Sequence, residues 1–173
     1  MDLDSSESET YGQQEGSAYN GYFCCRCYHP LFCFNQFGDL ERAMLRNGNV
    51  HSAEGVVKFY NQRGVAEQWI KEGKNAVRWT KLSCHDFLDN QVRLQLFALA
   101  YNLGNFLWRL VLPRGLNWTM TTLREKLVKI GAKVVRSARY VTFQLAEVAV
   151  SKRLFTAILQ RIERLRSPPL VPG

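Results

Sequence analysis

The chain has 173 residues, of which 46% are hydrophobic, and it carries a formal net charge of +8 with a pI near 9.4. This length is enough to bury a hydrophobic core, so one domain or a domain fragment is expected. The positive charge favours a polyanionic partner such as nucleic acid. Residues 1–20 lack the basic start and apolar run of an export signal, so no signal peptide is expected.

Residues 1–21 are acidic and polar, and their composition alone favours a disordered tail. The next segment, up to Gly38 and Asp39, is dense in aromatic residues and contains Pro30, which predicts β-structure with turns. Residues 40–45 predict a further short strand.

The five cysteines favour reduced, partly buried thiols, because the number is odd and the segment CCRCYH does not have a standard zinc-ligand spacing. A zinc site with His29 is the weaker alternative.

The stretch YNQRGVAEQWIKEGK, residues 60–74, predicts a helix with one polar stripe. At about 100° per residue, five side chains share a narrow arc: Tyr60, Arg63, Glu67, Lys71 and Lys74. One interpretation is an exposed face with ion pairs between neighbouring turns. The other is that Glu67 binds a metal ion while the cations hold phosphate, since a carboxylate in a cationic frame suits Mg²⁺ and a polyanion.

Residues 89–111 predict a long apolar helix. Charged and amide side chains interrupt the apolar run that a membrane span would need, so we expect a buried helix and no membrane. Thr122 and Glu125 predict a capping box for a basic helix. Residues 133–136 and 140–145 predict two short strands, and a final helix is predicted over residues 154–165.

Basic residues greatly outnumber acidic ones between residues 121 and 166. Such a surface is often simply solvated, but in a DNA-processing protein it would contact phosphates and set affinity rather than sequence choice. The candidates for these contacts include Lys126, Lys129 and Lys133.

The spacing of Tyr60, Arg63, Glu67 and Lys74, with two, three and six residues between them, resembles the Y-R-E-K signature of the DDE transposases of bacterial insertion sequences. The segments DLDSSES, GQQEGSAYNG, CYHPLFCFNQFGDLERAMLR and GNVHSAEG also resemble the amino-terminal catalytic segment of that subgroup. The first catalytic Asp of the family precedes Ser or Thr at a strand end. By that pattern Asp4, followed by Ser5, is the candidate, and Asp2 is the close alternative.

This resemblance implies a cytoplasmic enzyme of DNA transposition, with an RNase H-like fold and Mg²⁺ (or Mn²⁺) held by carboxylates. Asp4 and Glu67 would be catalytic residues and metal ligands. Cationic and tyrosine side chains would bind transposon-end DNA, and these are Tyr60, Arg63, Lys71 and Lys74.

In the resembled family a long insertion with a central strand and the second catalytic Asp follows the segment HSAEG. Here HSAEG, residues 51–55, runs directly into VVKFYNQRG. We therefore expect an internal deletion near Gly55 and Val56. The predicted fold class is α+β: an incomplete RNase H-like catalytic domain with a mixed sheet remnant and a mainly helical carboxy-terminal half.

The predicted organisation is an amino-terminal part at 1–55, a part with the Glu helix and basic helices at 56–166, and a flexible tail at 167–173. The function expected from this organisation is that of a truncated and catalytically defective transposase. One alternative is a DNA-binding remnant that inhibits intact transposase, and the other is an inert decayed product. The chain would associate with intact transposase or with further copies of itself.

Loss of the central strand predicts that Phe32, Phe34 and Trp69 lack their usual packing partners. The helical part at 59–112 should be the most ordered region, and residues 1–20 the least.

Overall fold

The computed structural model describes residues 1–51, 66–146 and 150–165. The chain divides into two compact units, Met1–Asn105 and Phe106–Gly173. Both contain helices and strands, so the fold is α+β, as predicted. The expected junction near Gly55 and Val56 lies outside the described residues.

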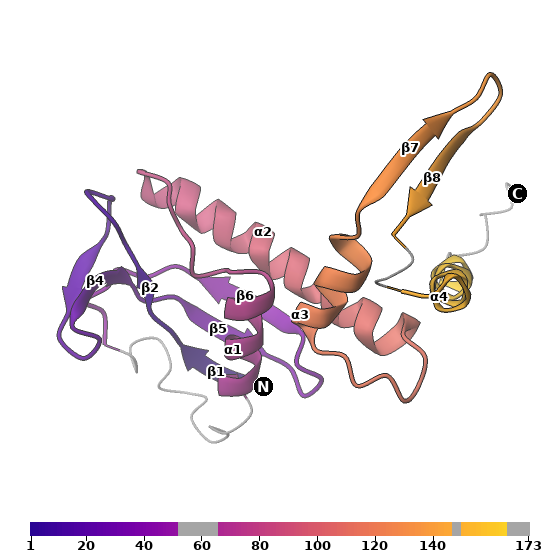
Figure 1. The fold of residues 1–173 in the computed structure, drawn as a ribbon. Helices are drawn as coiled ribbons and strands as arrows, with labels where there is room; N and C mark the ends of the chain where they lie inside the picture. The colour runs from indigo at the N-terminus through magenta and orange to yellow at the C-terminus, as the bar shows by residue number, and fades with distance from the viewer. Residues whose placement is uncertain (52–65, 147–149, 166–173) are drawn as a thin grey trace, which may run out of the picture. The chain divides into compact units, whose positions relative to one another are not determined.

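The strands of the first unit form two antiparallel sheets (Figure 1). One sheet has the order β1-β5-β6 and consists of β1 (Asp2–Ser5), β5 (Leu31–Phe34) and β6 (Leu40–Met44). The other has the order β2-β4-β3 and consists of β2 (Ser8–Glu9), β4 (Cys25–Tyr28) and β3 (Ala18–Asn20). In the described residues of the first unit, the expected mixed sheet remnant thus takes the form of two antiparallel sheets.

The acidic opening is part of these sheets, and not the disordered tail that its composition alone favours. In β1, Asp2 lies opposite Phe34 and Asp4 lies opposite Phe32. β1 pairs with the antiparallel strand β5, which is rich in aromatic residues. This pairing supplies backbone hydrogen bonds and packing, which composition alone does not reveal.

Two helices complete the first unit, and α1 lies beside β1 (Figure 1). Helix α1 (Ala66–Ala76) buries one face, made of Ala66, Ile70, Gly73 and Ala76. Helix α2 (Phe87–Phe106) buries Leu94, Ala98 and Tyr101.

Aromatic rings form the core of the first unit. The Trp79 ring stacks on Phe32 with 4.6 Å between centroids and lies 5.0 Å from Tyr101. Phe34 lies 5.3 Å from Trp69. Phe32, Phe34 and Trp69 therefore do have packing partners, because residues of α1, α2 and the segment between them cover β5. Burial of each ring contributes on the order of 2 to 3 kcal/mol to stability.

Helix α2 is only partly buried, which corrects the expectation of a buried helix. Leu94 is buried, whereas Val92, Leu96, Leu99 and Leu103 are exposed. None of the described helices combines the length and the apolar character that crossing a membrane requires.

The second unit contains η1 (Leu107–Val111), α3 (Met120–Leu123), η2 (Arg124–Val128), β7 (Ala132–Arg136), β8 (Val141–Leu145) and α4 (Lys152–Arg164). Its core is small and consists of Val111, Leu112, Leu123 and Ile158.

The helix predicted to begin with a capping box at Thr122 begins one turn earlier. Thr119 is the N-cap, and its hydroxyl oxygen accepts a hydrogen bond from the Thr122 N–H. Thr119 and Thr122 are both of a residue type that is favoured as N-cap. With Thr119 as the N-cap, Met120 and Leu123 lie in the helix and are buried.

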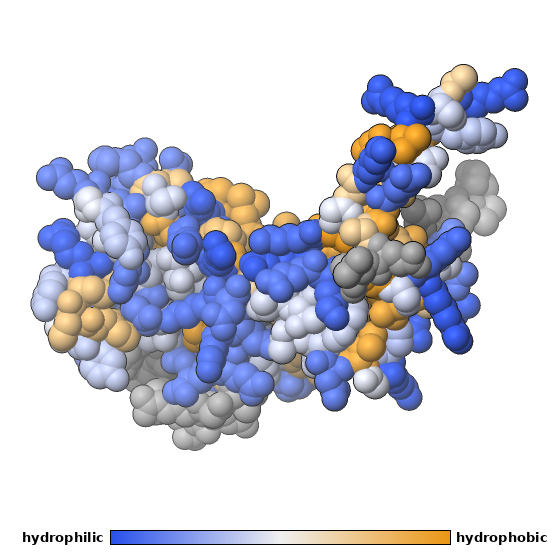
Figure 2. Space-filling model, viewed as in Figure 1, coloured by the Kyte–Doolittle hydropathy of each residue, from blue (hydrophilic) through white to orange (hydrophobic). Residues whose placement is uncertain are grey.

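The two predicted carboxy-terminal strands are confirmed as the antiparallel pair β7 and β8. Both strands are almost entirely exposed, and Figure 2 shows hydrophobic and hydrophilic residues side by side on this hairpin. The exposed hydrophobic residues include Val134 and Phe143.

Candidate functional site

Strand β1 positions the first candidate carboxylate. Asp4 precedes the last residue of β1, and its Oδ1 accepts a hydrogen bond from the Ser5 N–H at 2.8 Å. A carboxylate at a strand end has a backbone position fixed by the sheet, which suits a binding site.

Helix α1 positions the second candidate carboxylate. Glu67 lies in its first turn, where the helix dipole favours a negative charge, and Lys74 lies in its last turn. Because Ile70 and Gly73 are on the buried face, Glu67 and Lys71 are exposed beside it. This is the side-chain distribution that the polar stripe predicts.

Asp2, the alternative to Asp4, has a structural contact. Its side chain is buried, and its Oδ2 accepts a hydrogen bond from the Ala66 N–H at 2.8 Å. Asp2 therefore caps the start of α1 and ties that helix to β1.

A cavity of about 900 Å³ lies within the first unit and brings the candidate residues together. Asp4 from β1 lines it, as do Glu67, Lys71 and Lys74 from α1. Its wall also contains aromatic and polar residues from the segments around β3 and β6, among them Tyr19, Tyr22, Phe23, Asn49 and His51.

Glu7 is a cavity residue that the sequence patterns did not single out. Its Oε1 lies 2.7 Å from Lys74 Nζ. Burial disfavours the charged form of Glu7, but the hydrogen bond and the positive charge of Lys74 outweigh this, so the pKa of Glu7 is lowered. The cavity thus contains a carboxylate that neutralises one of its cations.

His29 also lines the cavity and was considered from sequence only as a zinc ligand. Its Nδ1 lies 2.9 Å from the carbonyl oxygen of Val50, and its buried Nε2 has no hydrogen-bond partner. Burial lowers the pKa of His29. The sequence signal for such a residue is a histidine close to the start of a buried strand, which is too common to be specific.

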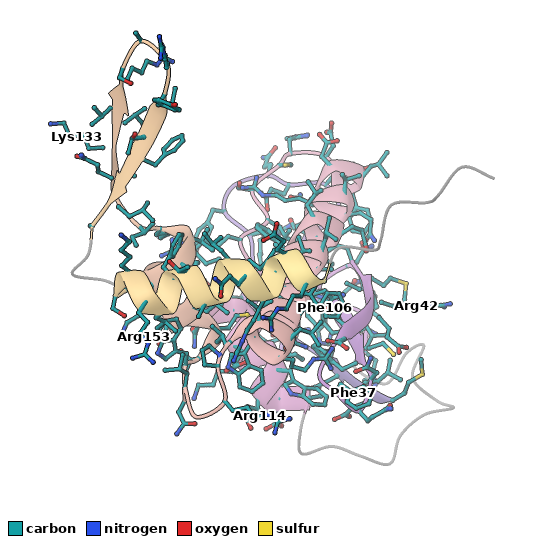
Figure 3. All side chains as sticks on the ribbon, turned by 90° about the vertical axis from the view of Figure 1, so that its right-hand side faces the viewer. Phe37, Arg42, Phe106, Arg114, Lys133 and Arg153 are labelled. Atoms are coloured by element: carbon teal, nitrogen blue, oxygen red, sulfur yellow. The ribbon has the colours of Figure 1, made fainter. Side chains whose placement is uncertain are left out.

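The structure describes none of the other predicted site residues at this cavity. Tyr60 and Arg63 fall outside the described residues. Lys126, Lys129 and Lys133 belong to the second unit, where Lys126 Nζ lies over the Trp118 ring at 5.1 Å from its centroid. Lys129 and Lys133 are exposed, and Figure 3 shows Lys133 extending outward from β7.

The donor set fits a metal centre only in part. Carboxylate oxygens are the ligands that Mg²⁺ prefers, and Asp4 and Glu67 supply two carboxylates to one cavity. Among residues 1–51, 66–146 and 150–165, however, no three His, Cys, Asp or Glu side chains converge closely enough to hold a metal ion. All five cysteines are free thiols.

A family model described as transposase DDE domain group 1 matches the chain in two overlapping segments, residues 1–59 and 52–167. No curated protein and no solved structure matches the chain.

Proposed function

Because the chain belongs to the transposase DDE domain group 1 family, we propose that it is an internally deleted transposase that binds DNA but lacks a complete catalytic centre. Asp4 and Glu67 are two of the family carboxylates in this proposal. Its intact relatives are the insertion-sequence transposases with the Y-R-E-K signature.

One observation carries the proposal. Asp4 and Glu67 are far apart in the sequence, yet both line one cavity together with Lys71 and Lys74. Carboxylates that could share a divalent cation, next to amines that could hold phosphate, are the pairing that phosphoryl transfer on DNA requires. If the polar stripe of α1 were only an exposed face with ion pairs, Asp4 of β1 would not need to line the same cavity as Glu67.

The internal deletion is supported by three features. The sequence passes from HSAEG to VVKFYNQRG without a further strand-end Asp, and the family model matches in two pieces. An RNase H-like sheet places its catalytic acids on neighbouring strands, and β1, which carries Asp4, pairs with β5 alone among the strands of the described residues. A missing strand beside β1 accounts for all three.

Mg²⁺ or Mn²⁺ bound between Asp4 and Glu67 would supply positive charge next to a DNA phosphate. The two-cation centre of an intact enzyme needs a further carboxylate, and the described residues offer none close enough. We therefore assign the chain DNA binding without strand transfer.

The second unit provides a basic surface for DNA. Many of its exposed cations lie between the end of η2 and the end of α4, and Figure 3 shows Arg153 on α4 and Lys133 on β7. The exposed cations of this stretch include Lys129, Lys133, Arg136, Arg139, Lys152, Arg153 and Arg164. Several phosphate contacts of this kind give affinity that depends steeply on salt.

Fluorescence anisotropy with a duplex across a salt series tests DNA binding. The logarithm of the binding constant should fall by about 0.9 for each phosphate contacted per unit of the logarithm of salt concentration. Replacing Lys129 and Lys133 by Gln should reduce this slope by roughly 2, whereas replacing both by Arg, which keeps the charge, should leave it unchanged. A flat response in the unmodified chain would overturn the proposal.

An inhibitor of intact transposase remains the second candidate function. This function is favoured because, in the proposal, the chain keeps cations that contact DNA but lacks the second catalytic Asp. Such an inhibitor, acting by competition for DNA or by mixed assembly, would reduce cleavage by an intact family member in a mixture, and an inert product would not.

A further inference from the structure

Helix α2 carries a second apolar stripe in addition to the side that it buries. The buried side, which includes Leu94 and Tyr101, belongs to the core of the first unit. The second stripe, called the α2 seam below, lies in the same unit and consists of Val92, Leu96, Leu99 and Leu103. All four residues are between 53% and 62% exposed. A helix with apolar residues on two sides is expected to be covered on both of them.

The exposed face around the α2 seam is uncharged. In α2, all of which the structure describes, the exposed residues from Val92 to Leu103 are the seam itself, Gln95 and Ala100. The one charged residue in this stretch, Arg93, is partly buried and donates a hydrogen bond to the Ser83 hydroxyl. A face without exposed cations does not suit DNA, whereas a contiguous apolar face suits another protein surface.

The spacing of the α2 seam fits a second copy of the same helix. Its residues follow one another at intervals of four, three and four positions, the spacing by which two helices pair along an apolar seam. These intervals are the same in both directions, so an antiparallel copy presents an identical pattern. Pairing about a two-fold axis would place Val92 opposite Leu103 of the second copy, and Leu96 opposite Leu99.

Electrostatics favours the antiparallel arrangement over the parallel one. Antiparallel pairing places the positive amino-terminal end of each α2 beside the negative carboxyl end of the other. Parallel pairing would bring together the two copies of Asp89, which is exposed three residues before Val92. Like charges at such a distance repel.

We propose that the α2 seam is the interface through which two copies of this chain form an antiparallel dimer. A second copy is the occupant that the pattern of the seam specifies, since the residues that need cover are also those that supply it. The inference goes beyond the proposed function and does not depend on DNA binding.

The size of the α2 seam indicates a weak dimer. Burying the exposed halves of its side chains on both copies would remove on the order of 400 Å² of apolar surface from water. Stable specific interfaces begin at roughly 1,200 Å². The net charge of +8 on each copy also opposes association. The dimer should therefore coexist with the monomer at micromolar to submillimolar concentrations.

Sedimentation equilibrium of the full chain over this concentration range tests the proposal. The average mass should rise from 20.0 kDa towards twice that value. Leu96→Glu should weaken the dimer by at least about tenfold, because the interface would then have to bury an unpaired charge. Val128→Glu is the matched control, since Val128 is 66% exposed in the second unit and makes the same change in charge. This variant should dimerise as the unmodified chain does.

Two results of this experiment would overturn the proposal: a chain that stays monomeric throughout the range, and a dimer that Leu96→Glu leaves unchanged. Salt provides a further readout. Added salt screens the repulsion between two basic copies and should strengthen the dimer, whereas it weakens DNA binding. A dimer that dissociates on adding salt would contradict an uncharged interface.

Disulfide cross-linking tests the antiparallel register. Chains with Leu96→Cys and chains with Leu99→Cys, one of them tagged, should form a mixed cross-linked dimer in higher yield than either variant forms alone. The reason is that positions 96 and 99 lie opposite each other in the proposed pair. The unmodified chain, whose Cys24 is exposed, gives the background. Equal yields from the mixture and from each variant alone would contradict the antiparallel pairing.

Discussion

Lys74 Nζ and Glu7 Oε1 lie 2.7 Å apart, and this ion pair joins helix α1 to the segment between β1 and β2 within the cavity. Lys74 is the cation that the family resemblance assigns to DNA phosphate. A phosphate that enters the cavity therefore competes with the Glu7 carboxylate for the same ammonium group.

Glu7→Gln should raise the affinity for DNA, because it removes the competing charge. Partly exposed ion pairs contribute up to about 1 kcal/mol, so the gain should be at most about fivefold in the dissociation constant. Anisotropy at low salt measures it. Glu41→Gln is the matched control, since Glu41 is exposed on β6 and does not line the cavity. An equal gain in both variants would mean that overall charge, not Lys74, is responsible.

The same pair should make stability depend on pH. The pKa of Glu7 is lower in the folded chain than its usual value, so its contribution is present at neutral pH and is lost as pH falls through the folded pKa. The difference in unfolding free energy between the unmodified chain and Glu7→Gln, less than about 1 kcal/mol, should vanish in acid, below the ordinary range of glutamate near pH 4. Urea unfolding at neutral and acid pH measures this. A difference that persists in acid would contradict the ion pair as its source.

Asp2 should act as a helix cap. Asp2→Ala removes the acceptor for the Ala66 N–H and should cost roughly 0.5 to 2 kcal/mol of stability. Asp2→Asn keeps an acceptor oxygen and should cost clearly less. Thermal unfolding measures the loss of stability in each variant. Equal losses in the two variants would show that Asp2 does not stabilise the chain by capping α1.

Gly73 should tolerate no side chain. A Cβ at this position would overlap the Trp79 ring, which is itself fully buried and stacked on Phe32. Gly73→Ala should therefore destabilise the first unit by about 1 to 3 kcal/mol. Gly131→Ala is the control, because a Cβ there meets nothing within 4 Å. A neutral Gly73→Ala variant would mean that α1 does not pack on Trp79 as described.

The elements with strong local signals were predictable from the sequence. Aromatic and apolar runs indicated β5 and β6, alternation indicated the hairpin, and periodicity placed Glu67 and Lys71 on the exposed side of α1. These signals depend on neighbours a few residues away.

Contacts between distant segments were not predictable. The pairing of Glu7 with Lys74 and the Asp2 cap on Ala66 depend on how β1 meets α1, which periodicity does not specify. The contact between His29 Nδ1 and the carbonyl oxygen of Val50 likewise joins residues that are separated in the sequence by β5 and β6. Periodicity shows which face of an element is buried, but not which residue covers it.

We propose that the chain keeps Asp4 and Glu67 in one cavity without the set of carboxylates needed for strand transfer. A cleavage assay with Mg²⁺ or Mn²⁺ and a transposon-end duplex tests this proposal, run at a protein concentration where anisotropy shows the duplex to be bound. We expect binding with no metal-dependent nicking or strand transfer, and the same result for Glu67→Gln. Reproducible cleavage that is lost on Glu67→Gln would show that the catalytic centre is complete, and would contradict the internal deletion as a cause of inactivity.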